Sequence, residues 1–168
     1  MGFFVWVVLG SGLVGCISGV ACAQQGEDVP PKLRDALASK PFGDRYDASF
    51  RINPFYLRGD FDGDGIADYA MLVVDIKTQK RGIAVWLSSR REVVILGAGS
   101  PVRYGDQRED DLDFDVWRVT GTNLFDKSSS IETPPSFHGD AILVEKSESA
   151  SGIFYWKSGH FVWLQQGD

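Results

Sequence analysis

The feature that most constrains this chain is a short acidic loop, residues 60–68, between two segments that are typical of β-strands. Its sequence, Asp-Phe-Asp-Gly-Asp-Gly-Ile-Ala-Asp, alternates acidic residues with apolar residues and glycine. Gly63 and Gly65 permit the positive-φ backbone that a tight turn requires. The flanking residues, 55–57 and 69–74, are aromatic and β-branched, which favours strands. The sequence therefore predicts a tight connection between two strands that gathers several carboxylates in one place.

Carboxylates at this spacing are typical of a site for a hard cation, because Ca²⁺ takes about six to eight oxygen ligands at roughly 2.3–2.6 Å. Without a cation, each close pair of carboxylates would repel by about 4 kcal/mol at ~4 Å and an effective dielectric constant of ~20. We therefore predict a structural Ca²⁺ site rather than a plain solvated turn. The expected ligands are the side chains of Asp60, Asp62, Asp64 and Asp68 and the backbone carbonyl of Ile66.

The loop is not an EF-hand. An EF-hand loop needs a bidentate glutamate at its last position and a helix on each side, whereas Met71 stands there and the flanks are strand-like. The spacing D-x-D-x-D-G-x-x-D between two strands instead resembles the calcium loop of FG-GAP and VCBS repeats, as found in the propellers of integrin α-subunits. The resemblance implies that the five residues named above are calcium ligands. No second copy of the loop occurs in the chain, so a propeller built from such repeats is not expected.

The N-terminal residues 1–23 carry no charged side chain and begin with a dense apolar run. They end in Ala-Cys-Ala, and the polar residues 24–30 follow. This pattern predicts a signal peptide at 1–23, a mature chain that starts at Gln24, and an exported protein, periplasmic or secreted. An alternative takes Leu-Val-Gly-Cys, ending at Cys16, as a lipobox, so that the protein is a lipoprotein anchored through Cys16. A membrane-spanning anchor is the third interpretation, although glycines interrupt the run and it is short for a span of ~20 residues.

Charge and cysteine content narrow the possible partners. The formal net charge is −6 and no basic run occurs, which argues against nucleic acid as a partner. Both cysteines, Cys16 and Cys22, lie in the predicted signal peptide, so the mature chain has neither a disulfide framework nor a catalytic thiol. A bound ion would offer stability in their place. The sequence leaves the partner open between an unidentified protein and an envelope ligand, with membrane contact only if Cys16 is lipidated.

The rest of the chain predicts one α+β domain at 31–168, preceded by a flexible segment at 24–30. We expect a mainly antiparallel β-sheet, organised as a meander plus a C-terminal hairpin, with a short N-terminal helix at 32–38 after Pro30-Pro31. Residues 121–136 are rich in serine, threonine, asparagine and proline and predict a long loop. The expected strands are 50–52 with 55–58, 68–76, 83–87, 92–96, 141–145, 153–156 and 161–164.

A second acidic stretch lies at 109–115, where acidic and apolar residues alternate from Asp111 onward. The alternation alone predicts a half-buried strand with a solvated acidic face. The functional alternative is a second cation site, or a cell-envelope hydrolase that uses these carboxylates. We expect no catalytic residues otherwise, since the sequence lacks a serine-nucleophile motif and zinc-ligand spacing.

The C-terminal third predicts a hairpin whose aromatic side chains, at positions 154, 156, 161 and 163, form cross-strand pairs and core rather than a ligand groove. Residues 139–152 and the C-terminal residues from Trp163 onward are similar to those of small exported bacterial proteins. That resemblance implies a family but no activity. The sequence therefore predicts an exported, non-catalytic calcium-binding module with an interaction or inhibitor role. The alternative is the cell-envelope hydrolase that uses the acidic residues at 109–115.

Overall fold

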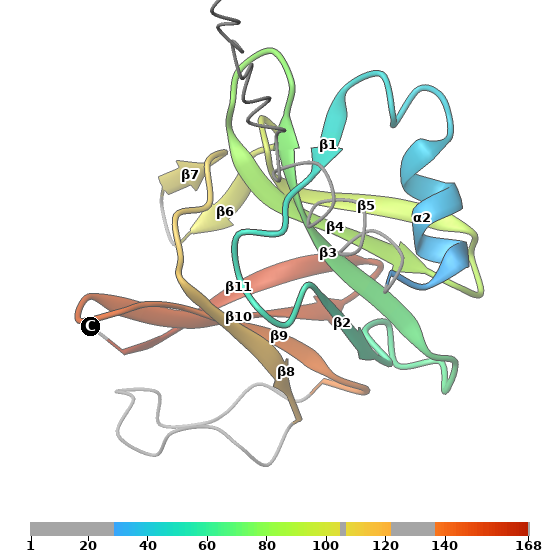
Figure 1. Ribbon diagram of the computed structural model, residues 1–168. Coiled ribbons are helices and arrows are strands. Elements are labelled where there is room, and N and C mark those ends of the chain that lie inside the picture. Colours follow the sequence, from blue (N-terminus) through green and yellow to red (C-terminus); the bar gives the residue numbers. More distant parts are fainter. Residues whose placement is uncertain (1–28, 105–106, 122–136, 168) are drawn as a thin grey trace, which may run out of the picture.

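The computed structural model describes residues 29–104, 107–121 and 137–167. The predicted signal peptide, its cleavage site and Cys16 lie outside these residues, as do 24–28 of the polar segment and 122–136 of the predicted long loop. Within the described residues the protein is mostly antiparallel β-sheet with one short helix (Figure 1). None of the helical structure described is long and apolar enough to cross a membrane.

The first sheet contains the predicted loop and has five antiparallel strands. The central strand β3 pairs on one side with β4, which pairs with β5. On its other side β3 pairs with both β1 and β2, one near each end. The strands are β1 (Tyr46–Ala48), β2 (Tyr56–Gly59), β3 (Asp68–Asp75), β4 (Arg81–Leu87) and β5 (Glu92–Gly97).

The second sheet has four antiparallel strands in the order β11-β10-β9-β8. These are β8 (Val116–Thr120), β9 (Ala141–Lys146), β10 (Ala150–Lys157) and β11 (His160–Gly167). Phe154 pairs with Trp163 across β10 and β11, and Trp156 pairs with Phe161, with ring centroids 4.8 and 5.0 Å apart. The four aromatic side chains are therefore cross-strand pairs packed at the core, as the sequence predicts. A separate two-stranded ribbon joins β6 (Val102–Tyr104) to β7 (Gln107–Glu109).

Strands β3 and β4 are largely buried on both faces, because helix α2 packs on one face of the first sheet and the second sheet packs on the other. Along β3 and β4, alternate side chains such as Leu72 and Val85 pack against the second sheet, in a core that includes Phe154. The intervening side chains, such as Met71, pack on the opposite face with Leu33 of helix α2 (Pro31–Ala38). Figure 1 accordingly shows three layers: helix α2, the first sheet and the second sheet.

Helix α2 forms where the sequence predicts a helix. Proline fits the first helical position, because its fixed φ suits a helix and its missing N–H would have no partner there. Pro31 occupies the first turn, and the helix ends at Ala38, before Pro41. The apolar stripe Leu33, Ala36 and Leu37 faces the sheet and is buried. Val29, just before the helix, is also buried, at 4% exposure.

Two of the predicted strands differ from the structure. The sequence predicts a strand at 50–52, but these residues form no strand, and the strand at this edge is β1, four residues earlier. Because β1 and β2 share one edge of β3, the chain between them leaves the sheet and returns. Residues 111–115 alternate in burial as expected but form no ladder, and the paired strand β8 begins only at Val116. The ribbon β6–β7 is not among the predicted strands, because its sequence has no strong strand signal.

Candidate metal centre

The acidic loop connects β2 to β3, which are antiparallel neighbours in the first sheet. Their last pair is Gly59 opposite Asp68, so the two ends of the loop lie side by side. Gly63 and Gly65 take φ values of +75° and +85°, in the left-handed region that glycine adopts without strain. The loop therefore folds back on itself, as the glycine positions predict.

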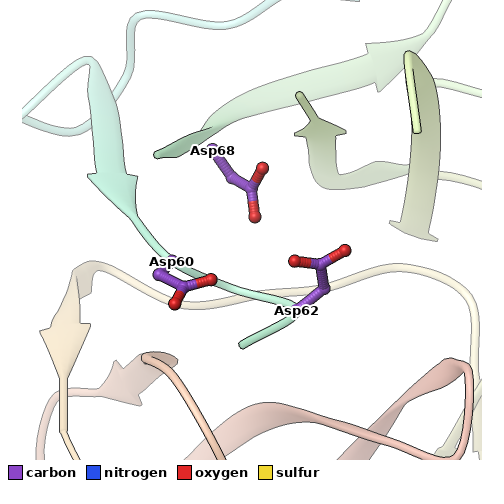
Figure 2. A group of neighbouring side chains, drawn as sticks. All are labelled: Asp60, Asp62 and Asp68. Atoms are coloured by element: carbon purple, nitrogen blue, oxygen red, sulfur yellow. The ribbon is translucent and has the colours of Figure 1, made fainter. Parts of the chain in front are cut away.

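This geometry brings together Asp60, Asp62 and Asp68. One carboxylate oxygen from each lies within 4.8 Å of those of the other two. Figure 2 shows the three side chains directed toward a common space between the loop and the start of β3. Two oxygens on opposite sides of a calcium ion are about 5 Å apart, so the spacing suits three ligands of one ion.

Taken as a whole residue, Asp68 is the most deeply buried of the three, with 1% of its surface exposed, whereas Asp60 and Asp62 are half-buried. Its Oδ2 accepts a hydrogen bond from the Phe61 N–H at 3.0 Å, and its Oδ1 accepts one from the Ser88 N–H at 2.8 Å. Burial nevertheless raises the pKa of Asp68 to about 6, and the negative charge of Asp62 acts in the same direction. A cation bound nearby would favour the ionised form of this carboxyl and lower its pKa.

Asp62 carries the clearest sign of a missing partner. Its side chain is 1% exposed. Oδ2 accepts a hydrogen bond from Arg90 Nε at 3.0 Å, whereas Oδ1 is buried and has no hydrogen-bond partner. A buried polar atom left without a partner costs about 1–3 kcal/mol, and more when it is charged. A cation bound between the three carboxylates would satisfy this oxygen.

Asp60 is oriented by its own loop and ties that loop to the second sheet. Its two carboxylate oxygens accept the N–H groups of Asp64 and Gly65, at 3.0 and 2.9 Å. Its backbone N–H donates to Asp140 Oδ2 at 2.9 Å, and its carbonyl accepts the Asp140 N–H at 2.6 Å. Asp140 immediately precedes β9. The loop is therefore joined to the second sheet by a reciprocal pair of hydrogen bonds.

The two other predicted ligands, Asp64 and Ile66, lie outside the group of three. Asp64 is exposed, and its Oδ1 accepts the Ile66 N–H at 2.8 Å. A hydrogen bond with Ser89, followed by the one from Ile66, lowers the pKa of the Asp64 carboxyl. The Ile66 side chain is 49% exposed, as a residue that contributes only its carbonyl can be. Ligand roles for these two residues stay predictions.

Sequence reasoning missed the turn between β4 and β5, which forms one wall of the site. In addition to its N–H bond to Asp68, Ser88 donates its hydroxyl to the Ala67 carbonyl at 2.7 Å. Arg90, in the same turn, reaches Asp62. These residues follow the loop by some 20 positions, and only the pairing of β3 with β4 places them beside it. A serine-rich turn carries no local signal for such a role.

In the second acidic stretch, 109–115, the carboxylates of Asp111 and Asp113 are paired with basic side chains, unlike the buried Oδ1 of Asp62. Asp111 and Asp113 line a cavity of about 350 Å³ together with Phe154 and Trp163. Arg81 binds both carboxylates, with Nη2 2.9 Å from Asp111 and Nη1 2.5 Å from Asp113. The pKa of the Asp111 carboxyl is lowered mainly by a hydrogen bond from Arg81. The pKa of the Asp113 carboxyl is lowered mainly by a hydrogen bond from Lys146.

The pKa of the Asp115 carboxyl is also lowered, by hydrogen bonds from the N–H and hydroxyl of Ser147. A general acid for hydrolysis needs a raised pKa. The described contacts therefore favour ion pairs that hold the chain together over a catalytic pair at 109–115.

Two glycines at the site allow a matched test of how tightly the loop is packed. Gly139 and Gly65 have similar φ values, +81° and +85°. A Cβ on Gly139 would lie 2.3 Å from the Asp60 carbonyl oxygen, whereas a Cβ on Gly65 would meet nothing within 4 Å. We expect Gly65→Ala to lower the free energy of unfolding by about 1 kcal/mol, from backbone strain alone. Gly139→Ala should cost about 2 kcal/mol or more, because the overlap with the loop backbone adds to the strain.

Urea denaturation of both variants measures this difference. Equal losses in the two variants would contradict the close approach of Gly139 to the loop.

Comparison of the chain with protein-family models, with curated proteins and with solved structures finds no match.

Proposed function

We propose that the chain is an exported, non-catalytic calcium-binding module in which the ion at 60–68 stabilises the β-fold. The observation that carries the proposal is the buried, partnerless Oδ1 of Asp62, which lies in a group of three converging carboxylates. Buried charged oxygens persist in folded proteins when they are paired or coordinate a metal. An ion between Asp60, Asp62 and Asp68 supplies the missing partner.

The chemistry of the ligands favours calcium. Every candidate ligand is an oxygen, which excludes the soft thiolate and imidazole sites typical of zinc. Magnesium prefers near-ideal octahedral geometry at about 2.0–2.1 Å, whereas calcium accepts the irregular ligand arrangement of a turned loop. We propose as ligands Asp60, Asp62, Asp64, Asp68 and the Ile66 carbonyl, the set that the resemblance to FG-GAP and VCBS loops implies.

The proposed ion would act as a clamp between three parts of the molecule. The loop itself joins β2 and β3, Asp68 accepts a hydrogen bond from the β4–β5 turn, and Asp60 is bonded to Asp140 at the start of the second sheet. An ion that fixes these carboxylates therefore fixes the junction of both sheets. This role suits a chain in which both cysteines lie in the predicted signal peptide, so that no disulfide is expected in the mature protein.

The proposal also covers the organisation and location of the chain. The fold is an antiparallel meander followed by a C-terminal hairpin, which the successive pairing of β3 with β4, β4 with β5 and β10 with β11 supports. Export follows from the predicted signal peptide at 1–23, with lipidation at Cys16 as the alternative. The partner is an unidentified protein or an envelope ligand, so the module acts by binding.

Titration calorimetry of the full-length chain with Ca²⁺, with Mg²⁺, and with Ca²⁺ after treatment with a chelator tests the proposed function. We expect one Ca²⁺ per chain and weaker binding of Mg²⁺. Bound calcium at 100 times its dissociation constant would raise the free energy of unfolding by about 2.7 kcal/mol. The absence of any calcium-dependent heat, together with identical melting curves in calcium and in chelator, would refute the proposal.

A further inference from the structure

Arg90 connects the candidate metal centre to the second sheet. It lies in the turn between β4 and β5, and its Nε donates to Asp62 Oδ2 at 3.0 Å. The guanidinium also lies over the ring of Trp156 in β10, 5.1 Å from the ring centroid. The Arg90 side chain is 48% exposed, and the carboxylate and the aromatic face both favour its guanidinium in this position.

The charges around the site make this contact significant. The three carboxylates of the metal centre lie within 4.8 Å of one another, so without an ion they repel. Among the described residues, Arg90 is the basic side chain that forms an ion pair with this group. The centre therefore has one positively charged side chain, Arg90, paired with one of its three carboxylates.

The two oxygens of Asp62 are used differently. Arg90 holds Oδ2, while Oδ1 is buried and free of hydrogen bonds. A cation can therefore bind Oδ1 without displacing Arg90, and the two positive charges then share one carboxylate. In the cation-free loop, Arg90 is stabilising, because its positive charge offsets part of the repulsion between the carboxylates. Arg90 also weakens cation binding, because its positive charge repels the ion at short range.

We propose that Arg90 is a built-in counter-charge that keeps the cation-free loop folded and lowers its affinity for calcium. The inference rests on the proposed function and deepens it, since Arg90 then sets the calcium concentration at which the loop responds. An arginine that merely oriented Asp62 would have the opposite effect on affinity, because its loss would leave the ligand disordered. The sign of the change in affinity therefore separates the two roles.

The test is calcium affinity in the full-length chain, compared between wild type, Arg90→Gln and Arg91→Gln. Arg91 is the matched control: it is the next residue in the same turn, it is exposed, and it has no ion pair among the described residues. We expect Arg90→Gln to bind calcium about three- to tenfold more tightly and to melt at a lower temperature in chelator. Arg91→Gln should stay within about twofold of wild type in affinity.

Affinities are measured by competition against a chelator, starting from calcium-loaded protein, so that Arg90→Gln need not be stable without the ion. Weaker binding by Arg90→Gln would overturn the proposal and assign Arg90 a positioning role. Unchanged binding, or an equal gain in Arg91→Gln, would also overturn it, because the effect would then be absent or due to net charge alone. In either case the wild-type titration still reports the proposed function, which fails only if wild type itself binds no calcium.

Discussion

Asp62→Asn should abolish the calcium-dependent rise in melting temperature while leaving the cation-free protein at least as stable as wild type. The substitution keeps the shape of the side chain, and an amide oxygen can still accept the hydrogen bond from Arg90 Nε. The amide NH₂ then occupies the position of the partnerless Oδ1, where it can donate to the neighbouring carboxylates instead of repelling them. The change therefore removes a charged ligand without opening a cavity.

The expected size of the effect follows from linkage. In saturating calcium the wild type gains about 2.7 kcal/mol at 100 times the dissociation constant, which is roughly 6–12 °C for a domain of this size. Melting curves in calcium and in chelator measure the gain. Asp35→Asn, an exposed residue of α2 with the same change in charge, is the control and should respond to calcium as wild type does. A full calcium response in Asp62→Asn would show that the ion, if bound, is bound elsewhere.

Much of the candidate site is predictable because its information is local. The aspartates and the two glycines within residues 60–68 predict the turn of the backbone and the convergence of Asp60, Asp62 and Asp68, but not that Asp64 lies outside that group. The contributions of Ser88, Arg90 and Asp140 are not local, since these residues reach the loop only through strand pairing or across the two sheets. A sequence without aligned relatives carries no signal for such contacts.

The strands also differ in whether local sequence is enough to predict them. The strands β3, β4 and β5 are predictable because each is a continuous apolar run bounded by polar turns. The edge strand β1 is not, because its three residues carry no apolar pattern and only the register against Val73 to Asp75 defines it. Residues 111–115 show that alternation predicts which side chains are buried but not whether the backbone pairs. Their backbone remains outside a ladder while the acidic side chains bind Arg81, Lys146 and Ser147.

The cation-free protein should lose stability as the pH rises from about 4 to about 7, because Asp68 must ionise in a buried position. Its pKa is about 6 in the folded chain, whereas an aspartate in the unfolded chain titrates near 3.9. Between these values the folded state binds more protons than the unfolded state, so the free energy of unfolding falls with increasing pH. A difference of about two pKa units corresponds to a loss of about 3 kcal/mol, which is complete above the folded-state pKa.

Calcium should remove this loss, because a bound cation favours the ionised carboxylate and lowers the pKa of Asp68. The stabilisation by calcium should therefore increase from pH 4.5 to pH 7, and calcium affinity should fall by up to about tenfold per pH unit below the pKa of Asp68. The lowered carboxyl pKa values of Asp111, Asp113 and Asp115 contribute stability that is lost only at more acidic pH, so they leave this window undisturbed. Urea denaturation of wild type and Asp68→Asn in chelator, across pH 4.5–7, isolates the contribution of this one carboxyl. Parallel pH profiles in the two proteins would mean that Asp68 ionises without cost, and the argument that a buried carboxylate needs an ion would fail at its most buried member.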